Sequence, residues 1–288
     1  VASGYYTALV LEENKRILDS TLVNLEKLLK ETKAFVETGF LEETDYDQLQ
    51  VTYNTIENSL NAIDRQIEVS YLLFKIQLGL GLEEKVVLTE SIQDFLLQLN
   101  PDQLISEEFD LQENIDYRML ETQEQIQALS LKREKSKFLP SVNAFYTYTD
   151  RTNRPDFDFT INHVIGLGVN VPIFSSGQKL ARVQQAKIDL EKAKNNKAQT
   201  ADNLMMGFDQ ARNQFQNAFE KYKTQQKNVA LTKKIYDRTL IKYKEGMASS
   251  LDLTQANNQY LDSNSAYTNA ILELLNAKVT LDKTLNNY

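Results

Sequence analysis

The apolar side chains of the first half recur in alternating steps of three and four residues, the spacing of a coiled-coil helix. This pattern predicts one helix that ends at Gly39 and a second that ends near Gly79, with Thr44 or Asp45 as the cap of the second. Residues 1–81 are therefore expected to form an antiparallel helical hairpin. The two seams are Leu18, Leu22, Leu25, Leu29, Thr32 and Val36, then Tyr46, Leu49, Tyr53, Ile56, Leu60, Ile63, Ile67, Ser70 and Phe74.

The same spacing returns after Gly177. It predicts a very long helix to Glu245, a break at Gly246 and a last helix near the C-terminus, so that residues 175–288 form a second hairpin. Its seams are Ala201, Leu204, Phe208, Ala211, Phe215, Ala218, Tyr222, Val229, Tyr236 and Tyr243, then Leu253, Ala256, Tyr260, Ser263, Tyr267, Ala270, Leu274, Ala277 and Leu281. A further stripe in the last helix, at Leu261, Ile271, Leu275 and Leu285, predicts contacts with neighbours on two sides.

The two hairpins are an internal repeat, because their matching positions differ by a constant offset in residue number. The matched pairs are Gly39 with Gly246, Asp45 with Asp252, Gln48 with Gln255 and Tyr53 with Tyr260. The second hairpin follows a helix and two strand-like segments, whereas the first does not. We therefore expect that an equivalent segment precedes the first hairpin in a longer protein.

Within residues 161–177, the positions from Ile165 to Val171 follow a period of two, which is typical of a β-strand. The apolar positions are Ile165, Leu167, Val169 and Val171, and they alternate with Gly166, Gly168 and Asn170. Pro172 ends this strand, and an aromatic-rich second strand is expected at residues 141–149, with a polar loop at 150–158. Strands of about ten residues match a membrane-spanning β-hairpin. The sequence predicts such a hairpin over residues 141–174, and a sheet edge in a soluble domain is the alternative.

The remaining stretches have a weaker pattern. Residues 82–112 are interpreted as a connecting (equatorial) segment with a short strand or extended piece at Val86–Leu88 and a short helix at Ile92–Leu99. A helix is expected from about Asp110 to Phe138, so that residues 113–140 lead into the strands. The predicted fold class is mainly α, with two coiled-coil hairpins and one β-hairpin.

Composition narrows the function. The chain has 288 residues, a formal net charge of −8, a single histidine and no cysteine. These numbers argue against a nucleic-acid partner, a histidine-dependent catalytic triad and a multi-histidine metal site, so neither an enzyme nor a cofactor is expected. The basic run Lys132, Arg133, Lys135 and Lys137 is interpreted as a solvated helix face.

Four features together resemble the TolC-like outer membrane efflux proteins. They are Leu139-Pro140-Ser141 before a strand, the turn Pro172-x-Phe174-x-x-Gly177 after Gly166-x-Gly168, the tips FVETGFLEETDYDQLQ and KYKEGMASSLDLTQAN, and NIDYRMLE at residues 114–121. The resemblance implies a passive homotrimeric exit duct in the outer membrane of a Gram-negative bacterium, with its helices in the periplasm. It implies partnership with a periplasmic adaptor and an inner-membrane pump, in efflux or type I secretion. A periplasmic coiled-coil adaptor and a soluble structural coiled coil remain alternatives.

The resemblance also assigns roles to single residues. The channel entrance is expected at Asp252, Asp45, Gln255 and Gln48, where the family has an aspartate ring; the two glutamines depart from that pattern. Asp45 and Asp252 also suit helix N-termini irrespective of any channel. Adaptor contacts are expected at Gly39, Phe40, Leu41, Gly246, Met247 and Ala248, and lipid contacts at Ile165, Leu167, Val169 and Val171. The loop at 150–158 is then external, and Phe174 lies towards the periplasm.

Overall fold

The computed structural model describes residues 1–150 and 161–286, and helices dominate this part of the chain. The chain divides into two compact units. Residues 1–109 and 207–288 form one, called the helical unit here, and residues 110–206 form the other, called the strand unit. Helix α6 (Gln178–Lys244) contributes residues to both units.

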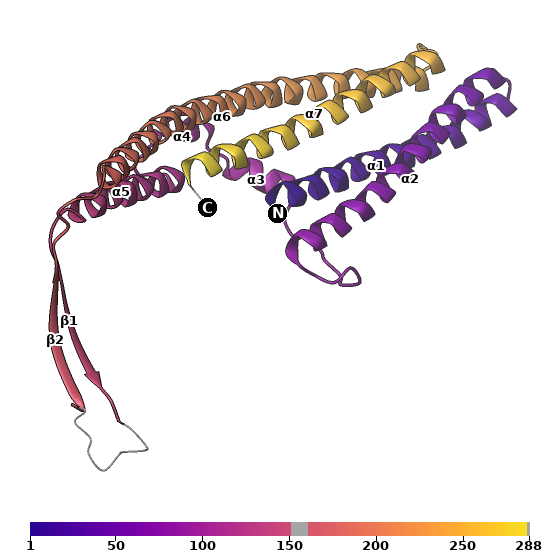
Figure 1. Cartoon of the computed structure of the whole chain (residues 1–288). Coiled ribbons are helices and arrows are strands. Elements are labelled where there is room, and N and C mark those ends of the chain that lie inside the picture. The colour runs from indigo at the N-terminus through magenta and orange to yellow at the C-terminus, as the bar shows by residue number, and fades with distance from the viewer. Residues whose placement is uncertain (151–160, 287–288) are drawn as a thin grey trace. The chain divides into compact units, whose positions relative to one another are not determined.

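The helical unit contains the first predicted hairpin and, of the second hairpin expected at residues 175–288, the part from residue 207 onward. Its first hairpin is α1 (Ala2–Glu37) and α2 (Glu43–Leu78), and the second pairs the C-terminal part of α6 with α7 (Ser250–Leu285) (Figure 1). The predicted seams form the core, since side chains from all four helices meet in one buried cluster. That cluster contains Leu25, Leu28, Leu29, Leu49, Ile56, Tyr236, Tyr243 and Leu253.

Two further apolar clusters extend this core along the unit. Phe208, Ala211, Phe215 and Ala218 of α6 pack against Leu274 and Leu281 of α7. The second stripe predicted on α7 is also buried, because Ile271 and Leu275 pack against Leu9 and Val10 of α1. The helix α7 therefore contacts neighbours on two sides, as its two stripes indicate.

The connecting segment follows its prediction in part, since a strand or an extended piece was expected at Val86–Leu88 and a short helix after it. No strand forms at Val86–Leu88, because no other strand lies there to pair with; the segment is irregular, and Leu88 packs against the apolar core. The expected short helix is α3 (Ile92–Gln98), which begins with a capping box formed by Ser91 and Asp94. The sequence pattern did not predict α4 (Pro101–Ser106), a single short helix capped by Asn100.

The strand unit contains α5, the two strands and the beginning of α6. Helix α5 (Ile115–Ser136) begins later than the predicted Asp110, because the Asn114 side chain accepts hydrogen bonds from two backbone N–H groups and fixes the helix start there. Strands β1 (Ser141–Tyr148) and β2 (His163–Asn170) pair antiparallel, with Ser141 opposite Asn170 and Tyr148 opposite His163. Apart from Asp150, the loop expected at 150–158 lies outside the described residues.

Candidate functional site

The tips of both hairpins begin with the same turn. Helices α1 and α6 each end at a glycine in the left-handed region, Gly39 with φ of 75° and Gly246 with φ of 71°. In both turns the glycine N–H donates to the carbonyl three residues earlier, and the next N–H donates to the carbonyl five residues earlier. This is the Schellman arrangement, in which glycine avoids the steric cost of a side chain. The repeat is therefore confirmed at this turn.

The helices that follow the two turns start differently. Ser249 caps α7, and the carboxylate of Asp252 accepts hydrogen bonds from the Ser249 backbone N–H and hydroxyl. These donors hold the pKa of Asp252 below its usual value. Helix α2 begins after Glu42, which makes no side-chain cap. The predicted cap by Thr44 or Asp45 is wrong, because both residues lie inside the first turn of the helix.

Asp45 forms a contact between the two hairpins instead. Its Oδ1 accepts a hydrogen bond of 2.6 Å from the hydroxyl of Ser250, at the start of α7. Nearby, the hydroxyls of Thr32 and Tyr243 lie 3.1 Å apart, and Lys244 lies 2.8 Å from Glu31. Burial raises the pKa of Tyr243, so its hydroxyl keeps its proton at neutral pH. These polar contacts join the first hairpin to the second at their tips.

The four expected entrance residues separate into different environments. Asp45 contacts α7 through Ser250, and the carboxylate of Asp252 accepts a hydrogen bond from Ser249, the cap of its own helix. Gln48 and Gln255 line one groove of about 610 Å³ between α2 and α7. The structure thus brings the two glutamines together and keeps Asp252 exposed at the tip. An electrostatic role for these residues stays a prediction.

The expected adaptor contacts also divide into two kinds. Phe40 is 79% exposed and Met247 is 65% exposed, so the two side chains project from the tips. Leu41 and Ala248 instead pack against the hairpin core. An apolar groove of about 280 Å³ beside them is lined by residues of α1, α6 and both turns, including Phe35, Phe40, Leu41, Tyr243 and Gly246.

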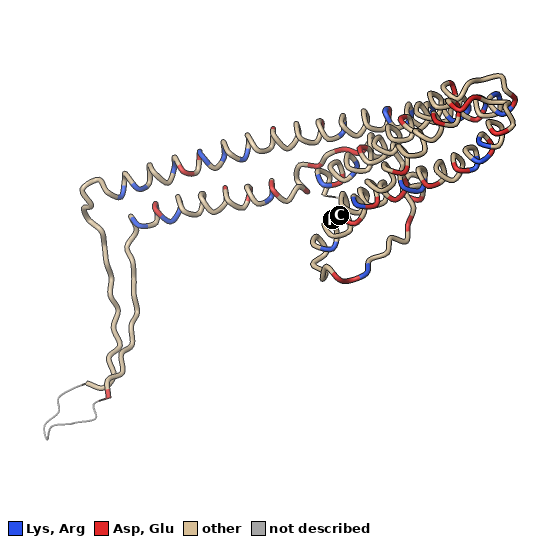
Figure 2. The backbone as a smooth tube through the Cα atoms, turned by 90° about the vertical axis from the view of Figure 1, so that its right-hand side faces the viewer, with Lys and Arg blue, Asp and Glu red and all other residues tan. Residues whose placement is uncertain are grey.

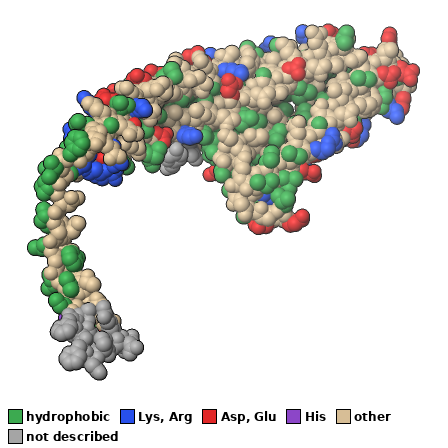
Figure 3. Space-filling view, viewed as in Figure 1, with side chains coloured by type: hydrophobic (Ala, Val, Ile, Leu, Met, Phe, Trp, Pro, Cys, Tyr) green, Lys and Arg blue, Asp and Glu red, His purple; other side chains and the backbone are tan. Residues whose placement is uncertain are grey.

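The strand pair presents exposed apolar side chains without a covering layer. Ile165 is 81% exposed and Leu167 is 76% exposed, and the register places Ala144 and Tyr146 beside them on the same face. Neither strand contains a charged residue, in contrast to the helices on either side (Figure 2). The space-filling view shows apolar side chains along the outer edge of this pair (Figure 3).

The two faces of the strand pair differ in side-chain size. Phe145 covers Gly166, where an added Cβ would lie 2.3 Å from the end of the ring. At the far end of the pair, the Tyr146 hydroxyl lies 2.7 Å from Nδ1 of His163, and the ring of Tyr148 lies against the same imidazole. Aromatic and amphipathic groups therefore gather at the end that leads to the loop.

Two negative findings apply to the described residues only. None of the helices there is both apolar enough and long enough to cross a membrane. No group of three or more histidine, aspartate or glutamate side chains in the same residues lies close enough to hold a metal ion.

Comparison with known proteins decides the family. Residues 104–287 match the outer membrane efflux protein family. The chain belongs to this family. The match covers the whole strand unit and both helices of the second hairpin, α6 and α7, while the first hairpin lies before the matched residues. No curated protein sequence matches the chain.

Solved outer membrane channels share the fold of this efflux protein. VceC of Vibrio cholerae matches 99% of the chain with a TM-score of 0.73 and 16% identity. CmeC of Campylobacter jejuni gives 0.70 and 18% over 99%, and the open state of MtrE of Neisseria gonorrhoeae gives 0.77 and 16% over 99%. The chain spans 68%, 61% and 64% of the lengths of these three proteins.

Some tip residues were not identified from the sequence. Ser250, Tyr243 and Thr254 make contacts between the hairpins, and Thr254 lies 3.3 Å from Thr52. One indication of these contacts was present in the sequence: Thr32 is a polar residue at a seam position where the other members are aliphatic. A polar residue in a coiled-coil seam often sets register through one specific partner.

Proposed function

We propose that this chain forms most of one subunit of a passive, trimeric exit duct of the outer membrane. The strand pair lies in the membrane, the helical unit lies in the periplasm, and the duct opens at the hairpin tips. A periplasmic adaptor and an inner-membrane pump or secretion ATPase supply the substrate and the energy. Membership in the outer membrane efflux protein family favours this function over a coiled-coil adaptor.

The observation that carries the proposal is the uncharged strand pair with its exposed apolar face. Ile165, Leu167 and Val169 are each at least 65% exposed, which is costly in water and favourable against lipid. Gly166, Gly168 and Asn170 face the opposite side, which suits a water-filled lumen. Alternation of this kind is typical of a transmembrane β-barrel strand.

The free edges of the two strands support assembly with further strands, and the assembly that we propose is a trimer. In hydrocarbon, each unpaired backbone N–H or C=O group costs several kcal/mol, so a spanning sheet must close into a barrel. Two strands cannot close on themselves, and the outer edges of β1 and β2 need partner strands from elsewhere. Further copies of the chain supply such edges. Exposed apolar residues on the helices, such as Val69, Ile76 and Ile235, provide further contacts between copies.

The tips form the proposed gate and docking surface. Asp45 and Ser250 hold the two hairpins of one subunit together, while Phe40 and Met247 project towards an adaptor. Asp252 places one exposed carboxylate per subunit at the entrance. With Gln255 and Gln48 in place of further carboxylates, the proposed entrance binds cations more weakly than a double aspartate ring.

Site-directed spin labelling tests the membrane assignment, because these 288 residues contain no cysteine and any cysteine elsewhere in the full-length protein can be replaced by serine. Single cysteines at Leu167 and Gly168 are neighbours on opposite faces of β2. In the reconstituted full-length protein, a label at Leu167 is expected to collide mainly with oxygen dissolved in lipid. A label at Gly168 is expected to collide mainly with a water-soluble nickel chelate. Equal access of the chelate to both labels would contradict the membrane assignment.

A further inference from the structure

Basic residues gather where the helices of the strand unit meet the strand pair. Over residues 131–140 and 171–188 the only acidic residue is Glu134. The basic residues of these two segments are Lys132, Arg133, Lys135 and Lys137 at the end of α5, and Lys179, Arg182 and Lys187 at the start of α6. We call this cluster the basic collar. Its charge is positive, whereas the whole chain carries a net charge of −8.

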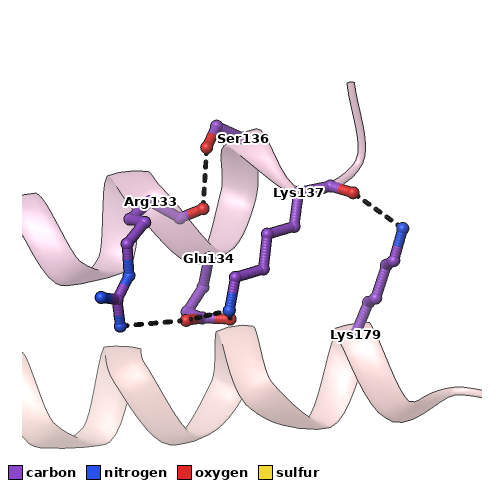
Figure 4. Close-up of polar contacts among 5 residues, drawn as sticks. All are labelled: Arg133, Glu134, Ser136, Lys137 and Lys179. Carbon is purple, nitrogen blue, oxygen red and sulfur yellow. Dashed lines mark hydrogen bonds and ion pairs between the residues drawn. The ribbon is translucent and has the colours of Figure 1, made fainter. Parts of the chain in front are cut away.

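Contacts bring the two parts of the basic collar together. Lys179 of α6 donates a hydrogen bond of 2.7 Å to the backbone carbonyl of Lys137 (Figure 4). The Nζ of Lys179 also lies 5.7 Å from the centre of the Phe138 ring. Segments that are far apart in sequence therefore present their cations on one local surface. A cluster of Lys and Arg side chains is visible at the base of the strand pair (Figure 3).

The acidic residue of the collar, Glu134, is already ion-paired with cations of the collar. Both carboxylate oxygens of Glu134 accept hydrogen bonds from Lys137, at 2.6 and 2.7 Å, and Arg133 lies at 3.4 Å (Figure 4). These cations hold the pKa of Glu134 below its usual value. In the described part of the chain, no carboxylate lies within ion-pair distance of Lys132, Lys135, Lys179 or Lys187. These four of the seven collar cations therefore have no ion-pair partner among the described residues.

Helix stability does not explain the whole cluster. Arg133 and Lys135 suit the last turn of α5, because a cation there offsets the negative end of the helix dipole. Lys179 has the opposite placement, since it lies in the first turn of α6, at the positive end, where acidic residues are absent. The Lys137 carbonyl at the end of α5 binds Lys179, but among the described residues neither Lys179 nor Arg182 has a carboxylate within ion-pair distance.

Apolar side chains border the basic collar on the strand side. Leu139, Val171, Ile173 and Phe174 are exposed between the collar and the strands, and Ile173 is 94% exposed. An apolar band that meets a cationic band reproduces the order of acyl chains and headgroups in a lipid leaflet. A soluble anion would bind only the cationic band and would leave these apolar side chains in water, so a lipid accounts for both bands.

We infer that the basic collar binds the anionic headgroups of phospholipids in the periplasmic leaflet of the outer membrane. This inference rests on the proposed membrane position of β1 and β2. The collar then limits how deeply the strand pair inserts, because cations stay with phosphates while Ile173 and Phe174 enter the acyl region. Each Lys or Arg near an anionic surface contributes roughly fivefold in lipid affinity.

Fluorescence quenching tests this inference directly, because the chain contains no tryptophan. In the full-length protein, with any tryptophan outside these 288 residues replaced by phenylalanine, Phe174→Trp places one reporter beside the basic collar. The protein is reconstituted in phosphatidylcholine that contains either dibrominated phosphatidylglycerol or dibrominated phosphatidylcholine. We expect the anionic lipid to compete for the reporter site about fivefold better than the zwitterionic lipid. The preference should fall towards one at high salt, because screening weakens exposed charge pairs.

Two matched variants identify the cause of the preference. Lys135→Gln/Lys179→Gln/Arg182→Gln removes three collar charges and is expected to lower the preference towards one. The control Lys192→Gln/Lys227→Gln/Lys234→Gln removes three exposed charges elsewhere and should retain it. If the collar variant does not reconstitute, the salt series on the Phe174→Trp protein tests the inference instead. A preference for the anionic lipid that does not change with salt would overturn it.

The outcomes separate the inference from the proposed function. Equal quenching by both brominated lipids, or an unchanged preference in the collar variant, would overturn anionic lipid binding while leaving the strand pair in the membrane. Absence of quenching by either lipid would overturn both, because Phe174→Trp would then lie outside the bilayer.

Discussion

The hydrogen bond between Asp45 and Ser250 yields the sharpest prediction about the hairpin tips. Removal of the donor by Ser250→Ala, or of the charge by Asp45→Asn, should loosen the contact between α2 and α7. A hydrogen bond to a charged group contributes roughly 1.5–3 kcal/mol. Ser250 is buried but Asp45 is half-exposed, so water partly replaces the lost partner. We therefore expect a coupling energy near the lower end, about 1–1.5 kcal/mol, or about five- to tenfold in the opening equilibrium.

Native-state hydrogen exchange of the backbone amides in residues 249–257 measures this opening. In a double-mutant cycle, each single variant should lower the opening free energy, and the double variant should lower it little further. Ser249→Ala provides the control, because it removes the α7 cap one residue away without touching Asp45, and its effect should add to that of Asp45→Asn. Additive effects of Asp45→Asn and Ser250→Ala would refute the reasoning.

Three further predictions follow from the helical unit. Phe215→Ala should lower the free energy of unfolding by about 3–5 kcal/mol in urea titrations, since Phe215 is fully buried, and a loss below about 1 kcal/mol would contradict this packing. Met247→Asp should abolish adaptor binding in pull-down and efflux assays, whereas Met206→Asp, also at an exposed methionine, should not; equal binding by both variants would remove Met247 from the docking surface. Because the folded pKa of Asp252 lies below its usual 3.8, the capping stability it supplies is present above that pH and is lost as pH falls through the lower, folded value. Carboxyl-carbon NMR titration should show this low pKa return towards 3.8 in Ser249→Ala, and an unchanged pKa would contradict the cap as its cause.

Much of the fold was predictable because seam spacing and glycine breaks are local signals. The three–four steps through Leu49 and Leu253 placed buried positions correctly, and Gly39 and Gly246 marked both turns. The period of two through Leu167 placed β2. Such patterns depend on neighbours within a few residues, so a single sequence contains the information needed.

Other features depended on tertiary neighbours and were missed or wrong. Val86–Leu88 has residue types that favour a strand, but no partner strand is nearby in the described structure. Leu41 and Ala248 are partly buried because they pack against the hairpin core, which the local pattern did not indicate, and the adaptor contact expected of them stays a prediction. The role of Asp45 was also out of reach, because its partner Ser250 lies in the other hairpin and no local pattern links the two.

Single-channel conductance in a planar bilayer tests the exit duct most directly. The full-length protein should insert as a trimer and give stable unit steps of current, and Ser250→Ala should raise the time spent open because it loosens the tips. Complete silence from an inserted trimer, with Ser250→Ala and Asp45→Asn both in place, would contradict a duct that opens at its hairpin tips.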